Sequence, residues 1–168
     1  FKKIKSEQKA KNLGISIGIK YEKGIEIIKR GMADAIQIYF SLIDSEPLKE
    51  LLPLAKKEGV GVIIAEPLAQ GLLTNKYKKG HIFPENDLRS NIYSRELLEK
   101  KLKRVEQFQF LIKENRTLNQ AALAYILTRN EISTCIPGSK SIQHLKSNIE
   151  SVNVKLENSE LKMINEIQ

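Results

Sequence analysis

Short apolar runs alternate along the chain with segments of helical periodicity. The apolar runs predict strands over residues 13–19, 35–40 and 60–65. Helices are predicted between them over about 22–30 and 46–58, each followed by a glycine, Gly31 and Gly59. The third run is apolar at almost every position, which is typical of a strand that is covered by helices on both faces or that lines a closed barrel. The β-α-β-α-β order predicts a parallel sheet with right-handed crossovers.

The second half of the chain begins with a long connection, residues 66–94, which has no sustained period. Connections of this length inside a compact unit are usually functional. Helices are predicted beyond it over about 95–114, 118–129, 141–150 and 159–167, and a fourth strand over 132–136. Thr117 and Gln120 have the spacing of a capping box at the start of the second of these helices. The pattern predicts one α/β unit of four strands without a linker.

Composition agrees with one globular unit and excludes several other classes. Of the 168 residues, 41% are hydrophobic and 29% are charged, which is enough apolar material for one core. Cys135 is the only cysteine, so no internal disulfide can form. No apolar run approaches the roughly 20 residues that span a bilayer, and no apolar signal core follows the basic N-terminus. We therefore expect a cytoplasmic protein with no membrane partner. Because the chain begins with Phe1, we also expect that a preceding segment has been left out.

The net charge of +8 predicts an attraction for anions such as nucleic acid or phosphorylated small molecules. Lysines crowd residues 2–11, 76–79 and 100–103, with glutamates mixed into the last group. Aromatic residues do not alternate with the basic ones, as a surface for stacking single strands would require. A nucleic-acid binder is therefore the weaker alternative, and we expect no nucleic-acid partner.

The most informative segment is IPGSKS, residues 136–141, which reads as a strand, a tight turn and the start of a helix. The first amides of a helix have no internal partner and lie at the positive end of its dipole. With Ser139, Lys140 and Ser141 beside them, they would form a cradle for a phosphate. The alternative is an ordinary Pro-Gly turn with Ser141 as the N-cap. Neither a Walker sequence nor Gly-x-Gly-x-x-Gly is present, which argues against a P-loop or Rossmann site.

Five stretches together resemble the C-terminal half of the aldo/keto reductases. They are KNLGIS at 11–16, DAIQIYFSLI at 34–43, ELLPLAKKEGVGVI at 50–63 leading into PLAQGLLT at 67–74, AALAYIL at 121–127, and IPG at 136–138 with Asn148 twelve residues beyond Ile136. The resemblance covers the whole chain and preserves the order of the stretches. It implies the C-terminal half, about four βα units, of a (β/α)8 TIM barrel.

The resemblance also implies an oxidoreductase that transfers hydride from NADPH to the carbonyl group of an aldehyde or ketone. The cofactor-binding residues that it implies are Ser16, Gln37, Pro67, Leu68, Gln70, Gly71, Gly138, Ser139, Lys140, Ser141, His144 and Asn148. Ser16 and Gln37 would bind the nicotinamide carboxamide, and residues 67–71 would cover the pyrophosphate. The turn 138–141 would hold the 2′-phosphate, with His144 and Asn148 facing the adenine. Each of these residues lies at the C-terminal end of a strand or in the loop after it, where barrel sites form.

The chain departs from the family pattern at Ser41, Glu66 and His144, where the family often has Asn, Ser, and Gln or Arg. The family's catalytic Asp, Tyr, Lys and His belong to the first half, and no residue here matches them, so we expect no catalytic residue and no metal ligand. His81 is expected to be a solvated loop residue. The isolated chain is therefore expected to be inactive, and to need the missing half or to self-associate. A non-enzymatic NADP-binding regulatory module is the main alternative function.

Overall fold

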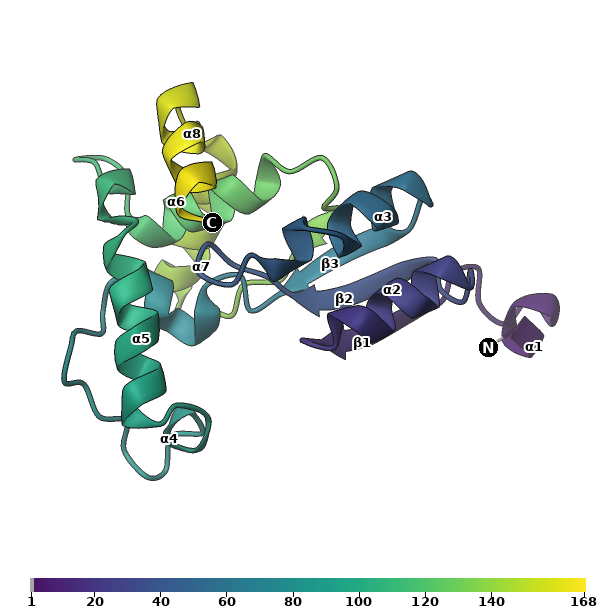
Figure 1. Ribbon diagram of the computed structural model, residues 1–168, viewed down its shortest axis with the longest axis horizontal. Helices are drawn as coiled ribbons and strands as arrows, with labels where there is room; N and C mark the ends of the chain where they lie inside the picture. Colours follow the sequence, from purple (N-terminus) through teal and green to yellow (C-terminus); the bar gives the residue numbers. More distant parts are fainter. Residues whose placement is uncertain (1) are drawn as a thin grey trace.

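Four parallel strands in the order β1-β2-β3-β4 form the only sheet within residues 2–168, which are the residues that the computed structural model describes. The strands are β1 (Gly14–Gly18), β2 (Ala35–Tyr39), β3 (Gly61–Ala65) and β4 (Thr134–Cys135). They run from the side of α1 (Lys2–Ser6) towards the side of α4 (Arg89–Ile92), as Figure 1 shows. The predicted parallel sheet and its order of elements are thereby confirmed.

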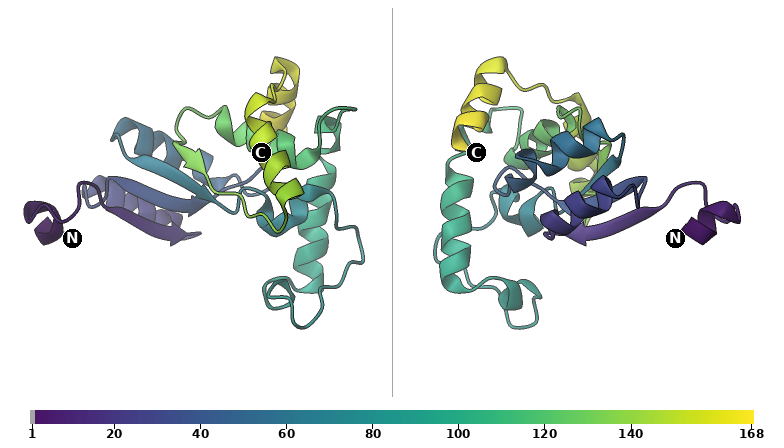
Figure 2. Two further views of the ribbon diagram at one scale, coloured as in Figure 1. Left: turned by 180° about the vertical axis from the view of Figure 1, so that it is seen from behind. Right: turned by 45° about the vertical axis from the view of Figure 1, so that its right-hand side comes forward.

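The two faces of the sheet differ in their covering. The helices α2 (Tyr21–Lys29) and α3 (Leu51–Lys57) cover one face, where Ile36, Ile38 and Ile64 are fully buried. The other face is visible without a covering helix when the molecule is seen from behind (Figure 2). One row of paired residues crosses all four strands on that face: Ser16, Gln37, Ile63 and Thr134. This row is mixed in polarity.

The predicted helix 46–58 is divided in two. A 3₁₀ turn, η1 (Glu46–Leu48), precedes α3, and Glu50 between them leaves the helical conformation, with φ −137° and ψ −48°. Pro53 explains the break, because it has no N–H and its ring clashes with a helical carbonyl four residues earlier, at Lys49. A proline is tolerated only in the first turn of a helix, so the helix starts again at Leu51.

The predicted helix 95–114 is shorter than expected. It ends as α5 (Arg95–Glu106) and continues as a 3₁₀ turn, η3 (Gln109–Leu111). Val105, Phe108 and Leu111 are all buried and lie three residues apart. A 3₁₀ turn places residues at this spacing on one side, whereas an α-helix rotates them away from it. Burial of all three side chains therefore favours the tighter turn.

The remaining predicted elements are confirmed with small changes of boundary. The helices are α6 (Leu118–Leu127), α7 (Ile142–Glu150) with a turn η4 (Ser151–Asn153), and α8 (Asn158–Ile167). The capping box of α6 is present, with the Thr117 N–H donating to Gln120 Oε1 at 3.0 Å. β4 is shorter than the predicted strand, although hydrogen bonds from Ser133 and Ile136 to β3 extend it at both ends. No helix within residues 2–168 is long and apolar enough to cross a membrane.

A buried ion pair connects α8 to the turn before α6. Arg116 and Glu160 are 9% and 4% exposed, and the guanidinium donates to both carboxylate oxygens. Arg116 also donates to the Leu111 carbonyl at 2.8 Å. The hydrogen bonds from Arg116 hold the pKa of Glu160 below its usual range.

Removing one partner of this pair is expected to destabilise the fold strongly. Arg116→Ala leaves the Glu160 carboxylate buried without its main partner, which costs about 3–5 kcal/mol in the free energy of unfolding. The matched control is Arg95→Ala, since Arg95 forms an exposed pair with Glu99 and should contribute less than about 1 kcal/mol. Urea unfolding measures both variants. If both variants lost the same free energy of unfolding, the buried pair would be no more stabilising than the exposed one, which would contradict this prediction.

The lowered pKa of Glu160 also fixes the sign of the pH dependence. The stability from this pair is fully present above the ordinary pKa of glutamate, about 4.3, because both partners are then charged in the folded state. It is lost as the pH falls through the lower pKa of the folded state. The free energy of unfolding of Glu160→Gln should therefore fall less than that of the wild type as the pH is lowered below the ordinary pKa of glutamate. Urea unfolding at a series of pH values measures this difference.

Candidate functional site

The predicted site residues lie at or beyond the carboxyl ends of neighbouring strands, or within them. Ser16 in β1 and Gln37 in β2 are register partners, and Gln37 Nε2 donates to Ser16 Oγ at 3.1 Å. Their side chains project from the face of the sheet that α2 and α3 leave uncovered. Two polar groups in contact on this face can offer both a donor and an acceptor to a small amide.

The loop after β3 has a strained backbone. Glu66, Ala69 and Gln70 all have positive φ angles although none is glycine, and Gly71 has a φ of 93°. Such backbone conformations persist only where the surroundings enforce them, and they cluster at functional sites. Gln70 Nε2 donates to Glu66 Oε1 at 3.3 Å, so Glu66 is bound within the loop itself. Pro67 and Leu68 are buried and anchor the loop.

The turn after β4 is exposed and ends in a capped helix. Ser141 is the N-cap of α7, and its Oγ accepts from the His144 N–H at 3.1 Å. Gly138, Ser139 and Lys140 are exposed, as is His144. The N-cap that the sequence left as an alternative is therefore present, and it leaves the preceding exposed turn available to an anion.

Asn148 supports this turn from inside. It is only 8% exposed, and its Nδ2 donates to Ser139 Oγ at 2.9 Å and to the Gly138 carbonyl at 3.4 Å. These bonds connect the last turn of α7 to the turn that precedes the helix. The Asn148 side chain therefore stabilises the conformation of the turn. Its position in the sequence did not indicate this role.

Sequence reasoning missed a cluster around Arg89 in the long connection. Arg89 Nη1 donates to the Gln70 carbonyl at 3.1 Å and to the Tyr77 hydroxyl at 2.6 Å. Its Nε donates to Asp87 Oδ1 at 2.8 Å, and the guanidinium lies 4.4 Å from the centre of the Phe83 ring. The connection is thus folded onto the strained loop after β3. The sequence indicates this cluster only by Asp87 and Arg89, which are two positions apart and have aromatic residues on both sides.

His81 belongs to the same cluster, which corrects the expectation of a solvated residue. Its ring lies 4.7 Å from Tyr77 and 4.8 Å from Phe83, measured between ring centres. The side chain is half-buried because three aromatic rings share a small volume. His81 therefore helps to order the connection.

Acidic groups lie beyond the ends of β2 and β3. Asp44 follows β2, accepts from Ser41 Oγ at 3.4 Å and forms an ion pair with Lys101 of α5. Ser41 is fully buried, so its hydroxyl is directed to Asp44 and not to the open edge. Burial raises the pKa of Glu66, and the charge of Asp44 raises it further.

Two tyrosines lie near these carboxylates. Burial raises the pKa of Tyr21 to about 12, and the charge of Asp44 adds to the effect. Burial also raises the pKa of Tyr93 to about 12, with a further contribution from Glu66. The Tyr21 hydroxyl donates to the Tyr39 carbonyl at 3.0 Å. Both phenols are therefore weaker acids than a free tyrosine.

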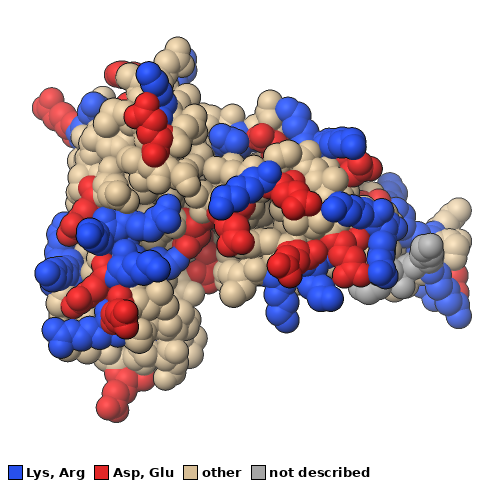
Figure 3. Space-filling model, in the orientation of Figure 1, with Lys and Arg blue, Asp and Glu red and all other residues tan. Residues whose placement is uncertain are grey.

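Two further features of the surface lie outside the candidate site. A hollow of about 780 Å³ lies at the opposite end of the sheet, where it is lined by residues such as Lys29, Asp34 and Glu58. Sites of parallel barrels form at the carboxyl ends of the strands, so this hollow is not part of the candidate site. On the face in Figure 3, Lys and Arg are interspersed with Asp and Glu, without a continuous basic tract. Within residues 2–168, no three His, Cys, Asp or Glu side chains gather as a metal site would require.

The fold is that of a parallel α/β protein in which the polar residues Ser16 and Gln37 lie in β1 and β2 and an exposed turn, residues 138–141, follows β4. The sequence matches the aldo/keto reductase family over residues 1–168, and the chain belongs to this family. It is 33% identical to aldo-keto reductase str7 of Strobilurus tenacellus over 96% of this chain and 49% of that protein. It is 27% identical to the NADH-specific methylglyoxal reductase of Escherichia coli over 98% of this chain and 50% of that protein.

Solved structures agree with these matches. The holo form of aldo-keto reductase AKR11C1 from Bacillus halodurans aligns with a TM-score of 0.75 and 26% identity, over 99% of this chain and 53% of that one. The chain thus spans about half the length of the relatives that it matches. Since the structural neighbours are (β/α)8 barrels, the four strands correspond to half of a barrel, as the resemblance implied. The family consists of oxidoreductases that generally bind NAD(P)(H).

Proposed function

We propose that this chain forms the cofactor-binding half of an NADP(H)-dependent reductase of aldehydes or ketones. The proposal rests on one observation: the Ser16–Gln37 pair lies in β1 and β2, and the exposed turn 138–141 follows β4 of the same parallel sheet. A small carbonyl compound is the proposed substrate, in keeping with the name of the related methylglyoxal reductase of Escherichia coli. The cytoplasm is the proposed location, because the free thiol of Cys135 suits a reducing compartment.

The residues present fit a dinucleotide. Gln70 Oε1 is buried and has no hydrogen-bond partner within residues 2–168, so it can accept a bond from a ligand. A side chain atom built on Gly138 would meet nothing within 4 Å, so the turn is open to an approaching group. The cationic Lys140 lies beside this opening. Together these features provide an acceptor, space and positive charge.

Each group has a proposed role. Ser16 and Gln37 bind and orient the nicotinamide carboxamide, and the loop with Pro67, Leu68, Gln70 and Gly71 covers the pyrophosphate. Gly138, Ser139, Lys140 and Ser141 hold the 2′-phosphate of the adenosine, while His144 lies towards the adenine and Asn148 fixes the turn. When bound, the dihydronicotinamide supplies hydride to a carbonyl carbon. The chain's own residues bind and orient; we propose none of them as the proton donor.

Lys140→Ala tests the proposed function. One charge-assisted phosphate contact contributes on the order of 1.5–3 kcal/mol. The dissociation constant for NADPH should therefore rise roughly tenfold to a hundredfold, while that for NADH changes little. Lys146→Ala is the matched control, since Lys146 is an exposed lysine within α7, beyond the turn that contains Lys140.

Fluorescence titration of the 168-residue chain with each dinucleotide measures these constants. Equal losses for NADPH and NADH in Lys140→Ala would mean that Lys140 supports the fold and does not bind the phosphate. Failure of the wild-type chain to bind either dinucleotide would contradict the proposed function as a whole.

A further inference from the structure

The side chain of Arg89 joins the long connection to the loop after β3. Its Nη1 donates to the Gln70 carbonyl at 3.1 Å and to the Tyr77 hydroxyl at 2.6 Å. Its Nε and Nη2 donate to the two carboxylate oxygens of Asp87, at 2.8 and 2.5 Å. One planar guanidinium makes all of these bonds at once, because its N–H groups point in several fixed directions.

The guanidinium is also held by packing. It lies 4.4 Å from the centre of the Phe83 ring and 5.1 Å from the centre of the Tyr77 ring, and the side chain is only 17% exposed. A Cβ atom built on Gly71 would lie 3.6 Å from Arg89 Nη1, so the guanidinium also lies against the residue after Gln70. Rings, carboxylate and burial together fix its position, and it supports the loop after β3 from one side.

The loop that Arg89 contacts has an unfavourable backbone. Glu66, Ala69 and Gln70 have φ angles of 55°, 48° and 55°. Residues with a Cβ atom disfavour this left-handed conformation, so it persists only where the surroundings enforce it. The hydrogen bond from Arg89 ends on the carbonyl of Gln70, which is one of these residues. The bond therefore opposes relaxation of the loop to a more ordinary conformation.

We infer that Arg89 is a positioning residue for the dinucleotide, because it holds the loop after β3, through the Gln70 carbonyl, in the conformation that covers the pyrophosphate. The inference rests on the proposed function and deepens it. A loop that adopts its binding conformation for only part of the time raises the apparent dissociation constant by the inverse of that fraction. The pyrophosphate is common to NADPH and NADH, so Arg89 acts equally on both, whereas Lys140 is proposed to discriminate between them.

Arg89→Gln should raise the dissociation constants for NADPH and NADH by the same factor, about tenfold, as the loss of a hydrogen bond from a charged donor predicts. Fluorescence titration measures both constants under conditions in which urea unfolding shows each variant to be folded. The matched control is Arg95→Gln, which removes the same charge from a side chain that is 83% exposed. Solvent and salt screen that charge, so neither constant should change by more than about twofold.

Arg89→Lys separates positioning from charge. A lysine keeps the positive charge, but its single ammonium group cannot reproduce the planar set of bonds to Gln70, Tyr77 and Asp87. Most of the loss of affinity should therefore remain in this variant. Full recovery would show that only the charge at this position matters, and would overturn the inference.

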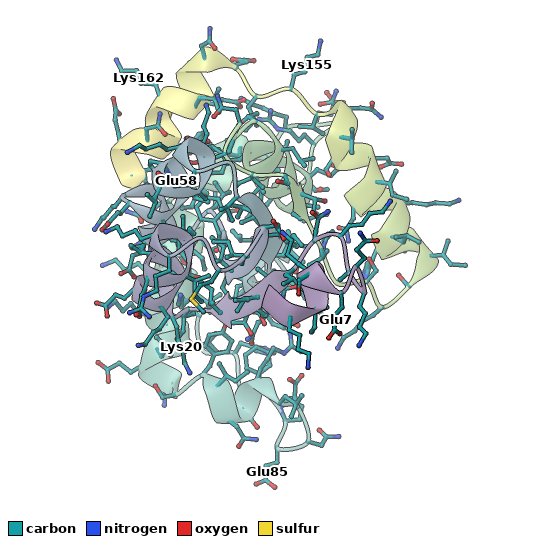
Figure 4. All side chains as sticks on the ribbon, turned by 90° about the vertical axis from the view of Figure 1, so that its right-hand side faces the viewer. Glu7, Lys20, Glu58, Glu85, Lys155 and Lys162 are labelled. Carbon is teal, nitrogen blue, oxygen red and sulfur yellow. The ribbon has the colours of Figure 1, made fainter. Side chains whose placement is uncertain are left out.

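Trypsin cleavage tests the contact without a ligand. The connection extends away from the sheet, with Glu85 at its outer end (Figure 4), and Lys76, Lys78 and Lys79 are exposed on it. Cleavage after these lysines should be faster in Arg89→Gln than in the wild type, because the connection opens locally more often. Coupling between two sites is reciprocal, so saturating NADH should slow this cleavage in the wild type and have little effect in Arg89→Gln.

Cleavage after Lys56 and Lys57, which are exposed in α3, reports opening elsewhere and should be the same in both proteins. An equal increase there would show a general loss of stability and would overturn the inference. Raised constants with unchanged cleavage of the connection would mean that Arg89 contacts the dinucleotide directly, and faster cleavage with unchanged constants would mean that the contact does not reach the site. Either result overturns the inference while the proposed function stands.

Should Arg89→Gln lose its cooperative unfolding, Arg89→Lys takes its place in the titrations and in the cleavage experiment. In that case, wild-type constants and wild-type cleavage rates in Arg89→Lys overturn the inference. If the wild-type chain binds neither dinucleotide, the proposed function and the inference both fail.

Discussion

The 168-residue chain, purified alone, is expected to bind NADPH and to leave an aldehyde unreduced. Reduction of a carbonyl group needs a proton donor whose pKa lies near the working pH, and a positioned general acid contributes roughly 10²- to 10⁴-fold in rate. The tyrosines near the site do not meet this condition. Burial beside carboxylates raises the pKa of Tyr21 and of Tyr93 to about 12. The Tyr21 hydroxyl is moreover engaged with the Tyr39 carbonyl.

Loss of NADPH absorbance in the presence of a small aldehyde measures the reaction, and the binding titration provides the positive control. Turnover that disappears in Tyr21→Phe or Tyr93→Phe would contradict this expectation and identify the donor. Binding without turnover would agree both with a reductase that needs further residues and with a non-enzymatic binding module. Restored turnover after addition of a complementary polypeptide would separate these two alternatives in favour of the reductase.

The second large effect concerns association: at micromolar concentration the chain is expected to sediment as a dimer or a larger species. In the sheet within residues 2–168, β1 and β4 each have a neighbour on one side only. A parallel sheet of this kind can close with a second copy, β4 of each pairing with β1 of the other. Open edges of unpaired amides and carbonyls favour such pairing.

The helix that follows β4 adds an apolar surface. Ile142, Leu145, Ile149 and Val152 follow one side of α7 and η4, and each is at least 50% exposed. The face of the sheet that no helix covers does not form a continuous apolar patch, because its row of Ser16, Gln37, Ile63 and Thr134 is mixed in polarity. The α7 stripe therefore provides most of the hydrophobic contribution to association.

Leu145→Glu with Ile149→Glu is expected to shift the chain to a monomer in sedimentation velocity. Leu88→Glu is the matched control, because Leu88 is 79% exposed but lies on the connection far along the chain from α7. Added salt should strengthen the association of the wild type, since the net charge of +8 opposes it and salt shortens the range of that repulsion to about 8 Å. A compact wild-type monomer that unfolds cooperatively would contradict this prediction.

Local patterns in the sequence were sufficient for the order of the elements and for most of their limits. The alternation of apolar runs with helical periods predicted β1, β2 and β3 within a residue or two. The spacing of Thr117 and Gln120 predicted the start of α6, and an N-cap at Ser141 was one of two alternatives for that segment. These features depend on residues a few positions apart, so their physical cause is visible in the sequence. Where local pattern failed, at Pro53 and Phe108, a steric clash and the burial of neighbouring side chains decided the conformation.

The sequence by itself determined the parallel α/β class, the family resemblance and the candidate cofactor residues. Only the tertiary structure decided which of these residues meet and what supports them. Asn148 bonds to the turn ten residues earlier, Arg116 to Glu160 forty-four residues later, and Arg89 to the Gln70 carbonyl across the long connection. Contacts of this kind depend on how loops close and which charges are buried together. No local periodicity encodes them, because the partners become neighbours only after the sheet and its covering helices have formed.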